Sequence, residues 1–387
     1  MEELKFNSII NKLKKLVHGY LVEYIKLYPP SNLQEKQLGL SNGKEINIID
    51  YKTSDYLFKI GNVEIKNPII SAPLAGISDN TYRIFAKFFG SALTFTEMIA
   101  SYGIYYNHKK SLALTNITEF ERPCVLQIFG SNPEIMAEAA KRVEDKADII
   151  DINMGCPVPK ILRSGSGGFL LKDQKKVEKI ILKVVKAVKK PVSVKVRIGW
   201  NRDNINIIDI AKIIQGCGAS AIFIHGRTVK QGFSGEVDYE VVRKVKDTIS
   251  IPVIVSGDID SPQKALEVLK FTGCDGTMIG RAARGSIWLL LDILLSLGNQ
   301  YSFSSESNGV LKKIDFIPSV SWRKEFARLY LKFLIYFKGE YKATREFRKH
   351  LVWIFKGVKG ISKERKYFFR IETFKDTIDI IDSIGIN

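Results

Sequence analysis

The chain is poor in the residues that build disulfide frameworks and metal sites. Its 387 residues include only four cysteines and four histidines. The cysteines, at positions 124, 156, 217 and 274, form no Cys-x-x-Cys pair, and the sequence holds no His-Glu-x-x-His or mixed Cys/His cluster. These absences argue against a secreted disulfide scaffold and against catalysis at a bound metal. They favour a protein of a reducing cytoplasm.

Long apolar runs are also missing. Residues 1–28 carry apolar side chains at helical spacing, but lysines at 12, 14, 15 and 26 interrupt them, so neither a signal peptide nor a membrane span of about 20 residues can be drawn. The spacing predicts an amphipathic helix that ends before Pro29 and Pro30. We expect this helix to pack on the surface of the domain that follows, with binding at a membrane surface as the alternative.

Acidic residues are outnumbered. The chain has 59 Lys and Arg against 41 Asp and Glu, a net charge of +18, and residues 310–387 alone hold 18 against 9. Aromatic residues are interleaved with these cations, a pattern that predicts a polyanionic partner, most often nucleic acid. Arg345, Arg348 and Lys349 cluster at helical spacing and are the first candidates to contact phosphates. The alternative is a solvated helical surface over an aromatic core.

Short β-rich runs, in contrast, recur regularly between residues 67 and 283. Eight of them can be marked, at 68–74, 92–98, 124–129, 148–153, 192–198, 221–225, 252–256 and 276–280, and amphipathic segments of helical length fill most of the gaps. This alternation predicts an α/β fold, a (β/α)8 TIM barrel over residues 57–300. A doubly wound open sheet is the alternative, but no Gly-x-Gly-x-x-Gly follows the first run.

Flanking segments complete the predicted organisation. Residues 58–65 resemble a hairpin with Gly61 and Asn62 at its turn, placed to plug the lower mouth of the barrel. We expect an N-terminal helical extension over 1–56, a serine-rich linker over 301–317 and a small basic all-helical domain over 318–387.

The fourth run ends on a polar turn that contains Cys156. Active sites of TIM barrels are built at the C-terminal ends of the strands, so Cys156 is a candidate for chemistry, while a small buried hydrophobe is the alternative. Other strand ends carry polar residues that would converge on the same mouth. These are Gln127, Lys195, His225, Arg227, Ser256, Asp258 and Arg281. Gly257 and Gly280 follow the seventh and eighth runs, where barrels bind phosphate through backbone N–H groups.

Nine motifs along the chain resemble those of the flavin-dependent tRNA-dihydrouridine synthases. They are Ala-Pro-Leu-Ala-Gly-Ile-Ser-Asp at 72–79, Thr-Glu-Met at 96–98, Leu-Gln-Ile-Phe-Gly at 126–130, Asp-Ile-Asn-Met-Gly-Cys-Pro at 151–157, Val-Lys-Val-Arg-Ile-Gly-Trp at 194–200, His-Gly-Arg-Thr at 225–228, Ser-Gly-Asp-Ile at 256–259, Met-Ile-Gly-Arg at 278–281 and Arg-Lys-His at 348–350. They occur in the family's order and cover roughly residues 57–355. The pairing of the cysteine motif with His-Gly-Arg-Thr is specific.

The resemblance implies an FMN cofactor, NADPH as electron donor and a uridine in tRNA as substrate. Hydride would pass from flavin N5 to uracil C6, and Cys156 would protonate C5. A thiol suits this step independently, because its ordinary pKa of about 8.5 keeps it protonated at neutral pH. The residues implied to hold the cofactor are Pro73, Leu74, Ala75, Gln127, Lys195, His225, Ser256, Gly257, Asp258, Gly280 and Arg281. Asn153 and Arg227 would contact the substrate, and the basic tail with Arg345, Arg348 and Lys349 would bind tRNA.

The sequence departs from the family at a few positions. Ser256 stands where asparagine is usual, Leu74 where methionine is commoner, and the first 56 residues exceed the usual start. Two other functions stay open: another FMN-barrel reductase acting on a small enone, and an RNA-binding barrel without turnover. We expect a cytoplasmic monomer with no membrane span and no metal.

Overall fold

The computed structural model describes residues 2–27, 57–301 and 316–385. Its described residues divide by packing into two units, each treated separately below. Of the described residues, the barrel unit comprises 57–83 and 91–281, and the helical unit comprises 2–27, 84–90, 282–301 and 316–385. Helix α3 (Asn80–Phe88) crosses the division. Most of the predicted linker, and the loop predicted after the first helix, lie outside the described residues.

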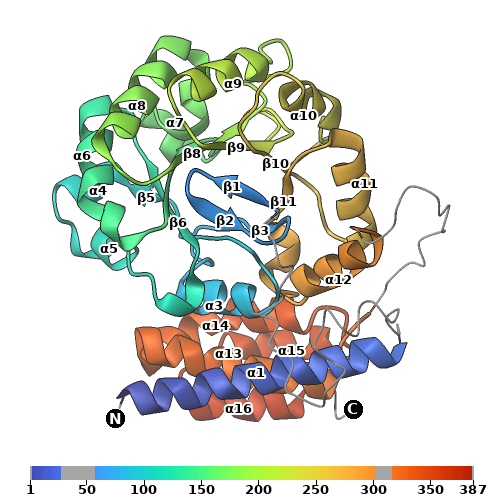
Figure 1. Ribbon diagram of the computed structural model, residues 1–387. Helices are drawn as coiled ribbons and strands as arrows, with labels where there is room; N and C mark the ends of the chain where they lie inside the picture. Colours follow the sequence, from blue (N-terminus) through green and yellow to red (C-terminus); the bar gives the residue numbers. More distant parts are fainter. Residues whose placement is uncertain (1, 28–56, 302–315, 386–387) are drawn as a thin grey trace. The chain divides into compact units, whose positions relative to one another are not determined.

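Eight parallel strands form the barrel. They are β3 (Ile69–Ser71), β4 (Thr94–Phe95), β6 (Cys124–Phe129), β7 (Ile149–Met154), β8 (Val192–Arg197), β9 (Ala221–His225), β10 (Val253–Ser256) and β11 (Gly276–Ile279). Each pairs with its neighbours in the order β3-β11-β10-β9-β8-β7-β6-β4, and a parallel bridge from Ile70 to Leu93 joins the first and last of this order. A short strand, β5 (Ile99–Ala100), extends the pairing along β6. The predicted TIM barrel is confirmed (Figure 1).

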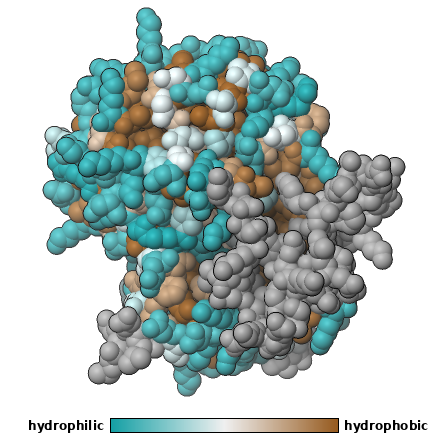
Figure 2. Space-filling view, in the orientation of Figure 1, coloured by the Kyte–Doolittle hydropathy of each residue, from teal (hydrophilic) through white to brown (hydrophobic). Residues whose placement is uncertain are grey.

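Helices surround the strands: α4 (Ser101–Tyr105), α5 (Lys109–Ala113), α6 (Pro133–Val143), α7 (Pro159–Arg163), α8 (Gln174–Ala187), α9 (Ile207–Gly216), α10 (Tyr239–Lys246) and α11 (Pro262–Thr272). Local sequence sets several of their starts. The side chains of Asn132, Asp173, Asp238 and Ser261 each accept a backbone N–H in the first turn of α6, α8, α10 and α11. Gly273 ends α11 in the left-handed conformation, with φ 63°. On the face shown in Figure 2, these helices present mostly hydrophilic residues with smaller hydrophobic patches between them.

The barrel interior changes character along the strands. Alternate residues point inward, and those at the N-terminal ends are apolar: Val125, Ile149, Ala221, Phe223 and Ile254 belong to one buried cluster. The next inward positions are polar, with Gln127 opposite Asp151, Asp151 opposite Ser193, and Asn153 opposite Lys195 in the strand register. The barrel is therefore sealed by hydrophobic side chains at one end and offers hydrogen-bonding groups at the other.

A two-stranded hairpin closes the apolar end. Strands β1 (Phe58–Ile60) and β2 (Val63–Ile65) pair antiparallel around a turn that contains Gly61. Ile60 and Ile65 are fully buried in the same cluster as the inward residues of the strands. The predicted plug is confirmed, and Figure 1 shows the hairpin across the centre of the ring.

The helical unit contains α1 (Glu2–Leu27), α12 (Leu289–Tyr301), α13 (Val320–Lys338), α14 (Glu340–Ile354), α15 (Ile361–Phe368) and α16 (Phe374–Ser383). Its core is strongly aromatic: Phe85 and Phe89 of the 84–90 segment make edge-on contacts with Phe326, with ring centroids 5.2 and 6.0 Å apart. The aromatic residues of the C-terminal segment thus supply a core, as the alternative interpretation of that segment expected.

The N-terminal helix is an integral part of this unit. Phe6 stacks on Tyr336 with centroids 4.6 Å apart, the Trp322 indole donates to the carbonyl of Leu16 at 3.2 Å, and the buried Tyr20 hydroxyl donates to Asp292 at 2.6 Å. The predicted amphipathic helix is confirmed, but the contacts named here are with α12 and α13 and not with the barrel surface we expected. No helix among the described residues is long and apolar enough to cross a bilayer.

Candidate active site

Cys156 lies in the loop after β7, and this loop is tied back to the end of the strand. The Asn153 Oδ1 accepts the N–H of Gly155 at 3.2 Å and the N–H of Cys156 at 3.0 Å. Cys156 is 9% exposed. Burial is the main influence on its pKa and raises it, outweighing the nearby positive charges of Arg197 and Lys195. The thiol therefore keeps its proton at neutral pH, as a general acid must.

A glycine turn packs over the cysteine loop. Gly168 donates its N–H to the carbonyl of Cys156 at 3.0 Å. Gly167 has φ 59°, and a Cβ there would lie 3.0 Å from the same carbonyl oxygen; a Cβ at Gly168 would lie 2.5 Å from Val229. These two positions require glycine because a larger residue would push the turn away from Cys156.

Arg197 is a site residue that sequence reasoning missed. Its guanidinium donates to the carbonyl of Gly155 at 3.0 Å and to that of Thr228 at 2.9 Å, so it joins the loop after β7 to the loop after β9. The side chain is almost fully buried. Its inward position, two residues after Lys195 on β8, was the available signal.

Lys195 places a partly buried positive charge inside the barrel. It lies opposite Asn153 in the strand register, and its ammonium makes no hydrogen bond or ion pair with the described residues. Burial lowers the pKa of Lys195 to about 8, helped by the charge of Arg197 and opposed by Asp151 and Cys156. A partly buried cation inside a barrel favours a ligand with negative charge or electron-rich atoms, so this position suits an electron-rich or anionic ligand.

Two further polar atoms at this end of the barrel are buried without a partner among the described residues. They are Nδ1 of His225 and Oγ of Ser256. Burial lowers the pKa of His225 to about 2, assisted by the charges of Arg197, Lys195, Arg227 and Arg281. The imidazole is therefore neutral at physiological pH and able to accept or donate one hydrogen bond.

An anion-binding geometry follows β10. Gly257 and Asp258 both have positive φ, 126° and 46°, and the Asp258 carboxylate pairs with Arg227 and, at 3.0 Å, with Arg281. These arginines lower the pKa of Asp258. Gly280 is open on its inner side, where an added Cβ would meet only the Ala72 Cβ, at 3.7 Å. Cations beside a turn of this backbone conformation have the chemistry that binds phosphate, so a phosphate at this turn stays a prediction.

The segment 73–75 follows β3 at the same end. Pro73 and Leu74 are partly exposed and Ala75 is exposed. Ser78 holds the segment by accepting the N–H of Leu74 at 2.9 Å, and the Glu97 carboxylate accepts the N–H of Gly76. The structure therefore brings the residues predicted in the barrel to one mouth. Arg227 lies there too, but it does not have a free side chain for the substrate contact that was predicted for it. Its buried guanidinium is occupied by Asp258 and the Gly235 carbonyl, so its contact with substrate stays a prediction.

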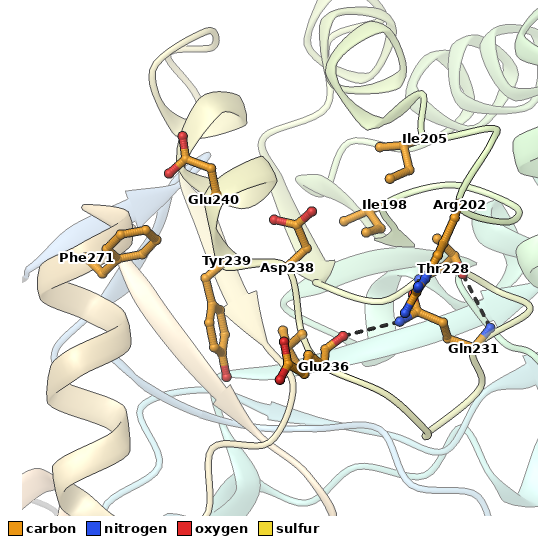
Figure 3. A pocket seen from close by; sticks show the side chains of 11 residues that line it. Ile198, Arg202, Ile205, Thr228, Gln231, Glu236, Asp238, Tyr239, Glu240 and Phe271 are labelled. Carbon is orange, nitrogen blue, oxygen red and sulfur yellow. Dashed lines mark hydrogen bonds between the residues drawn. The ribbon is translucent and has the colours of Figure 1, made fainter.

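A cavity of about 550 Å³ lies beside this turn (Figure 3). It is lined by Ile198, Arg202, Ile205, Thr228, Gln231, Glu236, Val237, Asp238, Tyr239, Glu240 and Phe271. The Tyr239 hydroxyl in its wall donates to the Gly257 carbonyl at 2.6 Å. Three carboxylates against one arginine make the cavity acidic, so phosphate fits the Gly257 turn and not this cavity.

Comparison with known proteins decides the family. The family model described as "Dihydrouridine synthase (Dus)" matches residues 70–384. The chain belongs to the dihydrouridine synthase family. It is 38% identical over 326 residues to tRNA-dihydrouridine synthase B of Vibrio parahaemolyticus, covering 84% of this chain and 97% of that protein. It is 39% identical over 316 residues to the protein of the same name from Vibrio vulnificus, covering 81% of this chain and 94% of that protein.

Among solved structures, histamine dehydrogenase from Rhizobium sp. 4-9 matches with a TM-score of 0.48 and 12% identity, over 63% of this chain and 47% of that chain. Helix α1 lies outside the part of the chain that the dihydrouridine synthase model matches.

In this dihydrouridine synthase, the three cations predicted to bind RNA on α14 already have partners. Arg348 donates to the carbonyl of Ile371 at 3.0 Å, Arg345 lies 3.7 Å from the ring centroid of Tyr341 and 3.6 Å from the carboxylate of Glu372, and Lys349 also interacts within the protein. Their contact with RNA stays a prediction. Arg348 in particular links α14 to the carbonyl of Ile371 and so has a structural role.

The freer cations of the helical unit surround α15. We define the α15 patch as the exposed residues Lys356, Lys359, Lys363, Arg365, Lys366, Tyr367, Phe369 and Arg370. Its six cations make no ion pair with the described residues, and Phe369 is 72% exposed. Exposed cations beside exposed aromatic rings are the surface that phosphates and unstacked bases prefer.

Proposed function

We propose that the chain is an FMN-dependent tRNA-dihydrouridine synthase that takes its electrons from NADPH. Family membership supports the reaction, and the buried thiol of Cys156 at the barrel mouth supports the chemistry most directly, because the reduction of uridine requires a proton donor near the base. When bound, the flavin supplies the hydride for C6 of the uracil ring. Protonation of C5 is then the protein's task.

The residues at the barrel mouth fit a flavin mononucleotide. The Gly257 turn with Arg281 and the open side of Gly280 would hold the phosphate, and Ser256 has a buried hydroxyl free to bond it. Lys195 and Gln127 would bond the polar edge of the ring, and the backbone at Pro73, Leu74 and Ala75 would line it. A negatively charged ring would pair with the ammonium of Lys195 and raise its pKa back toward the ordinary range.

Cys156 would donate the proton through its sulfur. The hydrogen bonds that Asn153 accepts from the backbone N–H groups of Gly155 and Cys156 hold the loop, and the Gly167–Gly168 turn packs against the carbonyl of Cys156. Arg197 and Lys195 would stabilise the thiolate that remains after transfer, so the thiol is both protonated before the step and supported after it. The substrate base would lie against this thiol with Asn153 beside it.

The helical unit would bind tRNA through the α15 patch. Its cations, which make no ion pair with the described residues, offer the phosphate contacts, although Lys366 and Arg370 also lie over the ring of Tyr367. The exposed ring of Phe369 offers a stacking surface for unpaired bases. This surface replaces Arg348 as the first choice, because Arg348 is engaged by the Ile371 carbonyl.

The decisive experiment combines Cys156→Ala with mass mapping of dihydrouridine in tRNA. The variant should retain flavin and be reduced by NADPH at the wild-type rate, and should form dihydrouridine about 10²–10⁴-fold more slowly. Cys217→Ala removes another thiol outside the site and should leave activity unchanged. Wild-type protein that binds flavin but reduces only small enones, or that binds tRNA without flavin, would replace this proposal with one of the other two functions.

A further inference from the structure

We propose that Asp151 is a positioning residue that fixes, through Gln127 and Asn153, the orientation of the Cys156 loop and of the Asn153 amide. Asp151 belongs to neither the cofactor set nor the substrate set above. It is fully buried in the middle of β7, two residues before Asn153. The catalytic consequence of this inference rests on the proposed function. The hydrogen-bond geometry from which it is argued is independent of that function.

A continuous chain of buried hydrogen bonds links Asp151 to the cysteine loop. Ser193 donates to Asp151 Oδ1 at 2.6 Å, and Gln127 Nε2 donates to Asp151 Oδ2 at 2.7 Å. Asn153 Nδ2 then donates to Gln127 Oε1 at 2.9 Å, and Asn153 Oδ1 accepts the Cys156 N–H at 3.0 Å. The four side chains lie on three adjacent strands, at paired positions of the register.

The donor and acceptor of every hydrogen bond in this network are fixed by its two ends, the backbone N–H groups of the cysteine loop and the carboxylate of Asp151. Backbone N–H groups can only donate, so Asn153 must turn its oxygen toward Gly155 and Cys156. Its amide nitrogen then faces Gln127, which must accept with Oε1 and donate with Nε2. That donation requires an acceptor, and the Asp151 carboxylate provides one. Without it, either Gln127 keeps an unsatisfied buried N–H or the amides reverse and point two donors at each other.

The chain also determines what Asn153 offers to a ligand. Its oxygen already accepts two backbone hydrogen bonds, so both lone pairs are used. One N–H of Asn153 donates to Gln127, and the other faces the sulfur of Met98, 3.9 Å from Nδ2, a weak acceptor that a ligand oxygen can replace. Asn153 can therefore present only a donor, which suits a carbonyl oxygen of a pyrimidine and rejects an N–H group at the same place.

Two isosteric replacements separate the acceptor from the charge. Asp151→Asn and Asp151→Leu both remove the negative charge, but only asparagine keeps an oxygen that can accept from Gln127. We expect the alkylation rate of Cys156 in the Asn variant to stay within about twofold of the wild-type rate. In the Leu variant, the cysteine loop should be held less firmly. The measurement is the alkylation of Cys156 by iodoacetamide in the flavin-free protein, followed by peptide mass spectrometry across pH. The plateau rate at alkaline pH should rise about tenfold in the Leu variant.

The other buried cysteines provide the internal control. Cys124 and Cys274 are buried and make no hydrogen bond to Asp151, Gln127 or Asn153, so their alkylation should not change between variants, which excludes general unfolding. Gln127→Met cuts the same chain while Asp151 stays in place, and it should reproduce the Leu variant even if that variant folds poorly. In an Asn153→Ala background, Asp151→Leu should add nothing further.

Several outcomes would overturn the proposal. One is an equal alkylation rate of Cys156 in the Asp151→Asn and Asp151→Leu variants. Another is a wild-type alkylation rate in Gln127→Met. The third is a double variant, Asp151→Leu with Asn153→Ala, in which the two effects on the rate multiply. Failure of wild-type protein to form dihydrouridine would instead refute the proposed function, and the alkylation experiment would still decide the role of Asp151.

Discussion

Replacing Asp292 by asparagine should stabilise the helical unit and remove most of its pH dependence. Asp292 lies on α12, almost fully buried, where it accepts a hydrogen bond of 2.6 Å from Tyr20 of α1. Burial raises the pKa of Asp292 to about 8, and the hydrogen bond from Tyr20 opposes this only in part. An ordinary Asp has a pKa of about 3.9.

The sign follows from proton binding. Because the folded protein holds a proton on Asp292 that the unfolded chain has released, its stability falls as the pH rises from about 4 to about 8 and levels off above that. At about 1.4 kcal/mol per pH unit, the loss at pH 7 approaches 4 kcal/mol as an upper limit. Asparagine keeps the acceptor for Tyr20 and has no such loss, but its buried NH₂ group lacks a partner, which costs roughly 1–3 kcal/mol. The net gain at pH 7 should be roughly 1–3 kcal/mol.

Urea denaturation at several pH values, followed by tryptophan fluorescence, tests this. Trp288, Trp322 and Trp353 belong to the helical unit, so the signal reports mainly on that unit. The wild-type midpoint should fall between pH 5 and pH 8, and the variant's midpoint should stay nearly level. Asp209→Asn, on the exposed side of α9, should leave both unchanged. Parallel pH profiles for wild type and Asp292→Asn would refute the reasoning.

The remaining predictions concern the barrel mouth and the α15 patch. Lys195→Ala should weaken flavin binding and slow reduction by NADPH, as measured by flavin occupancy after dialysis and stopped-flow absorbance. Unchanged values would mean that Lys195 has only a structural role, in which its charge interacts with Asp151. Since burial raises the pKa of Cys156, dihydrouridine formation should persist up to the ordinary thiol pKa of about 8.5 and fall only at higher pH, and a fall beginning near neutrality would contradict its role as acid. Lys363→Glu and Lys366→Glu should each weaken tRNA binding and reduce the slope of log affinity against log salt concentration by about one. Lys179→Glu, on the barrel, should change neither the affinity nor the slope.

Deleting the C-terminal helices is a poor test of RNA binding. Phe85 and Phe89 pack against Phe326, so a chain that ends near Ser304 would expose these rings and lose part of the fold. Point replacements within the exposed α15 patch avoid this because they leave the aromatic core untouched.

The barrel was predictable because its strands are short, buried runs bounded by turn residues. The predicted runs 124–129 and 221–225 coincide with β6 and β9. Inward polar positions at the strand ends could be read from the alternation, which located Gln127 and Lys195. The same alternation pointed to Arg197, but nothing in the sequence marks its bonds to two loop carbonyls.

Contacts between distant segments were beyond sequence reasoning. The hydrogen-bond partners of Tyr20 and Leu16 on α1 are 272 and 306 residues away, and the apolar stripe of the helix identifies no particular partner. Likewise, the charge pattern of 310–387 could not distinguish Arg348, held by a carbonyl, from Lys366, which is exposed. The pattern gives the electrostatics of the segment, and only packing decides which cations remain available.

The contact between Leu16 and Trp322 spans 306 residues, and this separation sets a delay during synthesis. At roughly 5–20 residues per second, α1 leaves the ribosome about 15–60 seconds before α13 exists to cover it. Throughout that interval Phe6 lacks the ring of Tyr336 and Tyr20 lacks Asp292, although Phe89, which also packs against Tyr20, emerges early. The lysines on the opposite face then serve the nascent chain, keeping an uncovered helix in solution until the last fifth of the protein arrives.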